Sequence, residues 1–176
     1  MKRVLYRVFF AAIIAHAVFA IDLPKPPSGF DWQEIPELKA AFLRPHDWFF
    51  KREEGKETLA YFITKESIEK GGEFQTGLTI NVFHLKKDPA IERGKYLIAQ
   101  IATKQHTKMW SRDYGPFKQF GCDYKDSESV VHNLTIANPK TNTLYLFIFE
   151  SPIPGSESAW KLGKPIMDNL AIDDDI

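Results

Sequence analysis

Residues 130–149 read VVHNLTIANPKTNTLYLFIF, and this stretch decides the fold. Two runs rich in β-branched and aromatic residues, 130–136 and 144–149, flank the turn-forming segment 138–142. Proline in that segment fixes φ and asparagine hydrogen-bonds its own backbone, so both favour a tight reversal. The pattern predicts a β-hairpin. Because the second run is apolar at every position, we expect a central strand that is covered on both faces.

Further strands are predicted upstream of this hairpin. Residues 77–85 alternate between apolar and polar side chains, which is typical of a half-buried strand. Residues 49–52 and 59–64 are aromatic-rich runs on either side of a polar loop that contains glycine, and they indicate a second hairpin. Residues 117–124 are expected to form one more strand.

Three helices are expected around these strands. Asp88 suits the N-cap and Pro89 the first position of a helix over residues 88–104. Residues 31–43 and 156–170 also carry apolar side chains at helical spacing. Together the elements predict an α+β fold, specifically an α/β/α sandwich with a mainly antiparallel sheet flanked by helices. The alternative is an all-β sandwich with peripheral helices, which the strong helical pattern of 88–104 disfavours.

The N-terminal residues 1–20 predict a secretory signal peptide. Three basic residues precede an apolar run over 8–18, and small residues stand at the two positions that signal peptidase inspects. The run is shorter than the roughly 20 residues of a membrane span. The alternatives are an N-terminal anchor or a buried helix. We expect a secreted or periplasmic protein without an integral span after cleavage, in which residues 21–36 form a linker and N-terminal segment and residues 37–174 form the domain.

Five short motifs in the chain match those of one known family. They are DWFFK at 47–51, TG at 76–77, KDPA at 87–90, LYLFIFES at 144–151 and AW at 159–160. In these motifs the chain resembles the PsbP-like family over residues 37–174. The resemblance implies the α/β/α sandwich shared by extrinsic photosystem subunits and a Ran-binding nuclear import factor, and a function of docking onto a larger partner. The predicted export signal argues against the Ran-binding role.

Charge and cysteine content exclude several classes of protein. The chain holds 23 basic and 23 acidic side chains, and no basic stripe points to nucleic acid. Cys122 is the single cysteine, so an internal disulfide is excluded and packing must supply the stability. We interpret Cys122 as a buried strand residue; an intermolecular bridge or a reactive thiol stays open. Asn133 begins a glycosylation sequon in the middle of a strand.

We predict no catalytic, cofactor-binding or metal-binding residues. The histidines of the exported part have no spacing typical of zinc ligands; they are His46, His84, His106 and His132. His132 is interpreted as a core or sheet-edge histidine. Ser156 lacks a nucleophile-elbow context and is interpreted as the N-cap of the last helix, which Pro165 should kink or interrupt. The alternative is a hydrolase or thiol enzyme that uses Cys122 or a Ser/His pair.

Residues 109–117 form the candidate partner-binding surface. This stretch holds Trp110, Arg112 and Tyr114 in what we expect to be a loop between a helix and a strand. Tryptophan, tyrosine and arginine are enriched where proteins recognise one another. The alternative is that the aromatic residues cover the edge of the sheet. We therefore expect an exported, non-enzymatic binding or accessory module that docks onto a larger protein partner, as yet unidentified, and needs no cofactor.

Overall fold

The computed structural model describes residues 23–55, 58–68 and 74–172. The predicted signal peptide and the acidic C-terminal residues lie outside this part of the chain. The elements follow the order β1 (Phe30–Ile35), η1 (Pro36–Leu38), β2 (Ala40–Pro45), β3 (Phe49–Glu54), β4 (Leu59–Thr64), β5 (Gly77–His84), α1 (Ala90–Lys104), β6 (Trp110–Tyr114), β7 (Phe117–Lys125), β8 (Ser129–Asn138), β9 (Thr143–Pro152), α2 (Ser156–Asp168) and β10 (Leu170–Ile172).

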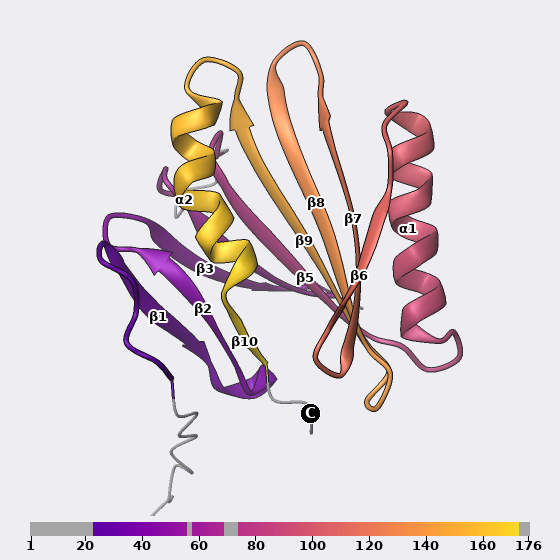
Figure 1. Cartoon of the computed structure of the whole chain (residues 1–176). Helices are drawn as coiled ribbons and strands as arrows, with labels where there is room; N and C mark the ends of the chain where they lie inside the picture. Colours follow the sequence, from indigo (N-terminus) through magenta and orange to yellow (C-terminus); the bar gives the residue numbers. More distant parts are fainter. Residues whose placement is uncertain (1–22, 56–57, 69–73, 173–176) are drawn as a thin grey trace, which may run out of the picture.

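The strands form two sheets (Figure 1). The larger sheet has seven strands in the order β3-β4-β5-β9-β8-β7-β6, and the smaller has three in the order β1-β2-β10. Every neighbouring pair is antiparallel. The α+β class, the antiparallel sheet and the hairpin of β8 and β9 are confirmed, and β9 occupies the middle of the larger sheet. The smaller sheet is an element that the sequence patterns did not reveal.

Side chains of β9 alternate between the two faces of the larger sheet. Tyr145, Phe147 and Phe149 are fully buried on the face that packs against the smaller sheet and α2, which we name the closed face. Leu146 and Ile148 point to the opposite face, which we name the open face, and are only half-buried. The main hydrophobic core therefore lies on the closed face.

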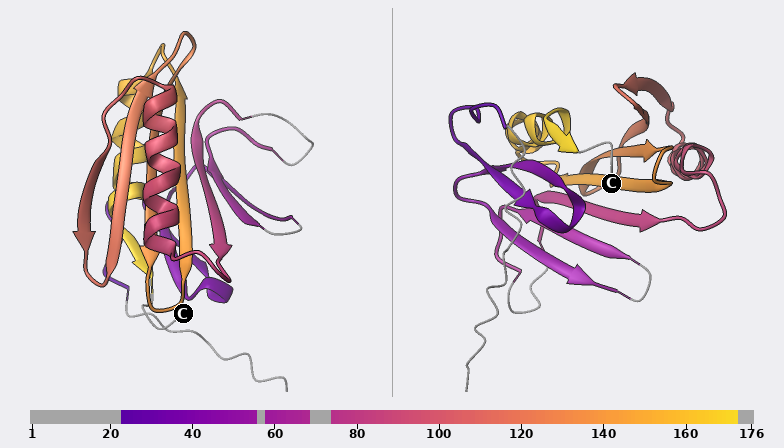
Figure 2. Two further views of the ribbon diagram at one scale, coloured as in Figure 1. Left: turned by 90° about the vertical axis from the view of Figure 1, so that its right-hand side faces the viewer. Right: turned by 90° about the horizontal axis from the view of Figure 1, so that it is seen from below.

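Helix α1 packs on part of the open face. Ile98 and Ala102 contact Phe120 and Cys122 of β7, and α1 also packs against β8 and β9. Gly94 allows this approach, since a Cβ there would lie 3.0 Å from Leu144 Cδ1. Figure 2 shows α1 lying over β7, β8 and β9, with β3, β4 and β5 to one side of it. One half of the open face therefore carries no helix among the described residues.

The start of α1 differs in detail from the sequence prediction. The helix begins at Ala90 with Pro89 at its N-cap, and Asp88 makes no side-chain cap. The Ala90 N–H donates instead to Oδ1 of Asn142, at 2.7 Å, from the turn between β8 and β9. A distant side chain thus satisfies the helix end that Asp88 was expected to cap.

The helix predicted over residues 31–43 is wrong. Strands β1 and β2 occupy this stretch and pair antiparallel around a single 3-10 turn at η1. Lys39 adopts the left-handed conformation, φ 43°, that reverses the chain after this turn. Ile35, Leu38 and Phe42 are buried at helical spacing, yet burial against the larger sheet satisfies them as strands. Tertiary packing has overridden a local periodicity.

Helix α2 lies on the closed face, and it differs from the sequence prediction at Ser156 and at Pro165. Gly155, with φ 96°, occupies the N-cap, so Ser156 is the first residue of the helix. Pro165 lies inside the helix without ending it. A Cβ at Gly163 would overlap the ring of Phe149, so α2 sits very close to β9. We attribute the continuation of the helix past the proline to this tight packing.

Candidate functional site

Trp110, Arg112 and Tyr114 lie on β6, an edge strand of the larger sheet, and not in a loop as predicted. The pairing of Tyr114 with Phe117 leaves Gly115 and Pro116 as a two-residue turn. Gly115 has φ 55°, which matches the glycine position of a type II′ hairpin turn. The Tyr-Gly-Pro-Phe sequence was the signal that could have identified this hairpin.

The three side chains of β6 have different surroundings. The Trp110 ring packs over Gly121 of β7 and is 38% exposed. The Arg112 guanidinium lies 5.4 Å from the centre of that ring. Tyr114 packs against the main core and donates its hydroxyl to the Leu170 carbonyl at 3.1 Å. Trp110 and Arg112 therefore form a surface pair, and Tyr114 ties the edge strand to β10.

Arg112 is held in place by two further partners. Its Nε donates to Oε1 of Gln119 at 2.6 Å, and its guanidinium lies 3.6 Å from the carboxylate of Asp168 on α2. Asp168 also pairs with Lys164 one turn earlier in the same helix. The arginine is thus ordered across the gap between β6 and α2.

A small pocket of about 110 Å³ lies in that gap, and we name it the β6–α2 pocket. The edge strand, the sheet and α2 each contribute to its lining, which comprises Trp110, Arg112, Asp123, His132, Asn133, Leu134, Trp160, Lys164, Met167 and Asp168. The fold thus brings Trp110 and Arg112 together with a group on α2 that sequence analysis missed. Trp160, Lys164 and Asp168 recur every four residues, a spacing that places them on one helix face.

His132 has two partners within this pocket. Its ring stacks on Trp160 with 3.5 Å between ring centres and 8° between planes. Its Nδ1 lies 2.8 Å from Oδ1 of Asp123, its neighbour across β7 and β8. His132 is partly buried on β8, an interior strand of the larger sheet, so its ring has partners as interpreted but lies neither in the core nor at the sheet edge.

The carboxylate–imidazole pair of Asp123 and His132 has no nucleophile beside it. A hydroxyl or thiol attacks only when a base lies within hydrogen-bond reach, and no serine, threonine or cysteine lines the pocket. Ser156 makes no side-chain hydrogen bond to a histidine among the described residues. The lining of the pocket therefore offers this pair no side-chain nucleophile.

Cys122 is fully buried and sits on the other face of the sheet. Its partner across β8 is Asn133, and it packs against Ile98 of α1. Burial, helped by the negative charge of Asp123, raises the pKa of the Cys122 thiol to about 11. The reactive thiolate is therefore disfavoured in the folded protein.

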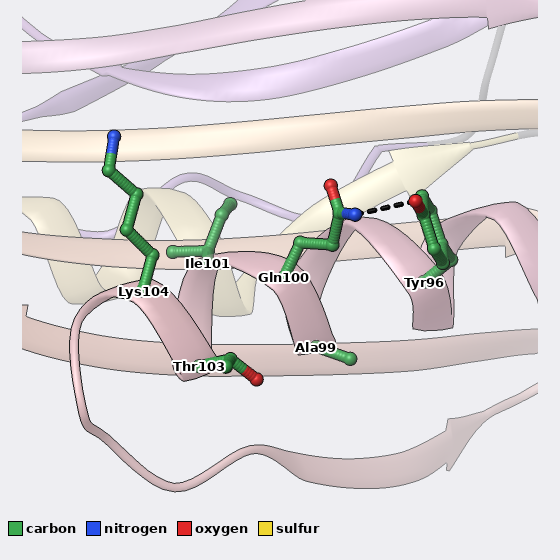
Figure 3. Close-up of a pocket in the computed structure, with 6 residues that line it drawn as sticks. All are labelled: Tyr96, Ala99, Gln100, Ile101, Thr103 and Lys104. Carbon is green, nitrogen blue, oxygen red and sulfur yellow. Dashed lines mark hydrogen bonds between the residues drawn. The ribbon is translucent and has the colours of Figure 1, made fainter.

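Outside the β6–α2 pocket, one hollow is formed by a single helix. This hollow, about 680 Å³, runs along the outer side of α1. Figure 3 shows that its lining residues all project from that one helix, from Tyr96 to Lys104, so no second wall faces them. Within the described ranges no three His, Cys, Asp or Glu side chains gather as metal ligands do. No helix in this part of the chain has the length and apolar character needed to cross a membrane.

The glycosylation sequon is placed where modification is blocked. Asn133 is 3% exposed in the middle of β8, so its amide is not accessible to a glycosyltransferase in the folded protein.

Comparison with known proteins identifies the fold. No family model matches the sequence, and no curated protein matches it. Among solved structures, the chain is similar to the solution structure of cyanobacterial PsbP (CyanoP) from Synechocystis sp. PCC 6803. The TM-score is 0.54 at 11% sequence identity, over 84% of this chain and 95% of that one. The PsbP-like fold that the sequence motifs implied is confirmed.

Proposed function

We propose that this domain, layered as an α/β/α sandwich, is an exported, non-enzymatic accessory module that docks onto a larger protein partner. The proposed contact surface is the β6 edge with Trp110, Arg112 and Tyr114. One observation carries the proposal: an exposed tryptophan and an ordered arginine stack on each other at a sheet edge, beside the β6–α2 pocket. Secretion or a periplasmic location follows from the predicted signal peptide over residues 1–20 and belongs to the same proposal.

The ordering of these side chains supports a binding role. Tryptophan and arginine are the residue types that most often dominate protein interfaces. Arg112 is already oriented by Gln119 and Asp168, so a partner would lose little affinity to side-chain ordering. The β6–α2 pocket has room for a single side chain of the partner between Trp110 and Trp160.

Backbone geometry adds a second reason to place the contact here. In a two-residue hairpin the closing pair, Tyr114 and Phe117, exchanges hydrogen bonds, and such pairs alternate along the strands. The backbone groups of Ser111 and Asp113 therefore point away from β7. No further strand pairs with β6 among the described residues, so these groups are available to a partner.

The test compares single substitutions at the proposed surface with matched substitutions elsewhere. Trp110→Ala and Arg112→Ala should each weaken capture of the native partner, the first by about 30-fold, which corresponds to 2 kcal/mol. Tyr96→Ala on α1, an aromatic residue that is 52% exposed, and Lys125→Ala at the end of β7 serve as controls.

Melting measurements separate binding from folding. Trp110→Ala should lower the melting temperature only modestly, because the ring covers Gly121 at the surface and not in the core. Tyr114→Phe should lower it slightly by removing the hydrogen bond to Leu170, with partner capture retained. Unchanged capture by both the Trp110 and Arg112 variants would refute the proposed surface, whereas the domain could still bind elsewhere.

A further inference from the structure

A second cavity lies on the open face, where the first half of α1 meets β5. Its volume is about 620 Å³, and we name it the α1–β5 corner. It is lined by Thr58, Phe83, His84, Leu85, Lys86, Asp88, Arg93, Leu97, Leu144 and Leu146. Binding sites for small molecules commonly have volumes of roughly 300–1,000 Å³ and combine an apolar wall with few polar groups.

The floor of this corner is apolar and partly open to solvent. Phe83 of β5 pairs with Leu144 of β9, and Leu146 is the next residue of β9 that points to the open face. Leu97 of α1 forms the opposing wall. Phe83, Leu97 and Leu146 are each half-buried, so a ligand would remove further apolar surface from water.

The rim of the corner carries positive charge that no described residue pairs. Lys86 and Arg93 are exposed and form no ion pair with any described residue. Arg93 contacts only the Tyr96 ring, with 5.8 Å to its centre. Asp88 is the one carboxylate among the lining residues, which leaves an excess of one positive charge at the rim.

The backbone that presents these residues is held rigidly. Asn142 donates its Nδ2 to the Leu85 carbonyl at 2.9 Å and to the Asp88 carbonyl at 3.0 Å. The Leu85 N–H donates to the Asn142 carbonyl at 3.0 Å. Four hydrogen bonds, counting that from Ala90, thus lock the segment between β5 and α1 to the β8–β9 turn. A site built on such a segment is preorganised for its ligand.

We propose that the α1–β5 corner binds a single-chain anionic amphiphile, an alkyl chain with a carboxylate or phosphate head. The alkyl chain lies along Phe83, Leu97 and Leu146, and the head pairs with Lys86 and Arg93. A guanidinium and an ammonium on the rim of one cavity match both heads, because each head offers at least two acceptor oxygens. This proposal is independent of the docking surface, which lies on β6 and the opposite face of the sheet.

The direct test is calorimetric titration of the folded protein with four probes. Decanoate and decyl phosphate, each below its micelle concentration, should bind with one-to-one stoichiometry. Decyl maltoside, which keeps the chain without the charge, and inorganic phosphate, which keeps the charge without the chain, should bind at least tenfold more weakly. The tighter of the two anionic probes identifies the head as carboxylate or phosphate. Shortening the alkyl chain of the anionic probes should weaken binding about fourfold for each methylene removed.

Variants locate the site. Lys86→Gln and Arg93→Gln should each weaken decyl phosphate binding by about tenfold, as loss of a charged hydrogen bond does. Lys95→Gln serves as the matched control, because Lys95 is exposed on α1 but does not line the cavity. All three residues are exposed, so the folded state should persist in each variant.

Three results would overturn the proposal. Equal binding of decyl maltoside would mean unspecific adsorption to apolar surface, and equal binding of inorganic phosphate would mean that the floor contributes nothing. Unchanged affinity in both the Lys86 and Arg93 variants would place any bound amphiphile elsewhere. None of these results would affect the partner capture by β6 described above.

Discussion

The two faces of the seven-stranded sheet differ in how completely they are covered. The closed face packs against the smaller sheet and α2, and its residues on β9 are fully buried. The open face carries α1 over three strands only, and Leu146 and Ile148 beside it are half-buried. Both faces present apolar side chains from the same strand, so apolar character alone did not determine coverage. Each face is covered by the segments that pack on it: the smaller sheet and α2 on the closed face, and α1 on the open face.

The candidate sites on the two faces also differ in charge pairing. In the β6–α2 pocket, Arg112 and Lys164 share Asp168, and His132 faces Asp123, so the charges are balanced within the fold. In the α1–β5 corner the cationic rim has no ion pair from the described chain. The first arrangement suits a protein surface that orders its own side chains, and the second suits a charged ligand from outside.

The largest effect should come from truncation on the closed face. Phe147→Ala should lower the free energy of unfolding by about 3–5 kcal/mol, because it leaves a cavity in the main core. Leu146→Ala, one residue away on the open face, should cost about 1 kcal/mol, because Leu146 is already partly solvated. Urea denaturation followed by circular dichroism measures both. Similar losses for the two variants would contradict the distinction between the faces.

One methyl group added where each helix packs on the sheet should change the free energy of unfolding differently for α1 and α2. In an exposed helix, Gly→Ala gains about 1 kcal/mol. At Gly163 the new methyl would overlap the Phe149 ring, and overpacking costs about 1–3 kcal/mol. We therefore expect Gly163→Ala to destabilise the fold by about 1–2 kcal/mol.

At Gly94 the added methyl would meet the flexible end of Leu144 at 3.0 Å and the Thr135 hydroxyl at 3.1 Å. The two opposing effects should nearly cancel, so the free energy of unfolding should change by less than about 0.5 kcal/mol. A larger loss for Gly94→Ala than for Gly163→Ala would show that α1 is the more tightly seated helix, and would reverse the comparison.

The ionisation of the Cys122 thiol reports how well α1 excludes solvent from its half of the open face. The folded thiol has its pKa raised from 9.0 to about 11, so its contribution to stability is complete below pH 9 and is lost as pH rises from 9 towards 11. The melting temperature of the native protein should therefore fall more steeply over this range than that of Cys122→Ala, by roughly 5–9 °C at pH 11.

Thiol labelling at pH 8 gives an independent measure of the same burial. The folded protein should react with a thiol reagent far more slowly than the protein unfolded in urea. Rapid labelling of the folded protein would mean that α1 opens readily and that the reactive-thiol alternative deserves a new test.

The last comparison concerns two tyrosines on the closed face. The Tyr61 hydroxyl bonds to Oε1 of Glu37 at 3.0 Å, so Tyr61→Phe should cost about 1 kcal/mol. The Tyr145 hydroxyl is buried without a partner among the described residues, and burial raises the pKa of Tyr145 to about 12. Tyr145→Phe should therefore stabilise the fold by about 1 kcal/mol. Destabilisation by Tyr145→Phe in the same denaturation assay would show that the hydroxyl is satisfied.

Most strands and two of the three expected helices were predictable because their signals are local. The hairpin of β8 and β9, the alternation along β5 and the helical pattern of α1 each need only neighbours in sequence. The PsbP-like fold was also predictable, since its motifs lie in packing and turn residues that the sequence shows directly.

Residues 31–43 were misassigned because their structure depends on a distant partner, whereas residues 109–117 carried a local hairpin signal, Tyr-Gly-Pro-Phe, that the prediction of a loop overlooked. Strand β2 exists between β1 and β10, and β10 comes from the far end of the chain. For the candidate site, Trp110 and Arg112 were found from composition alone, whereas the pairing of Arg112 with Asp168 and the stacking of His132 on Trp160 were not. Local sequence patterns do not link such residues, because they lie far apart in the chain and meet only in the folded protein.

The sequence by itself thus determined the strands β5, β8 and β9 and the helix α1, and it determined that packing without an internal disulfide must hold the domain together. Only the tertiary structure decided that one face of the sheet is closed and the other half open. It also decided that Cys122 is turned away from His132 and that Lys86 and Arg93 stand over an apolar floor without an ion pair from any described residue. The physical reason is that periodicity is a property of neighbouring residues, whereas burial and charge pairing depend on contacts between segments far apart in the chain.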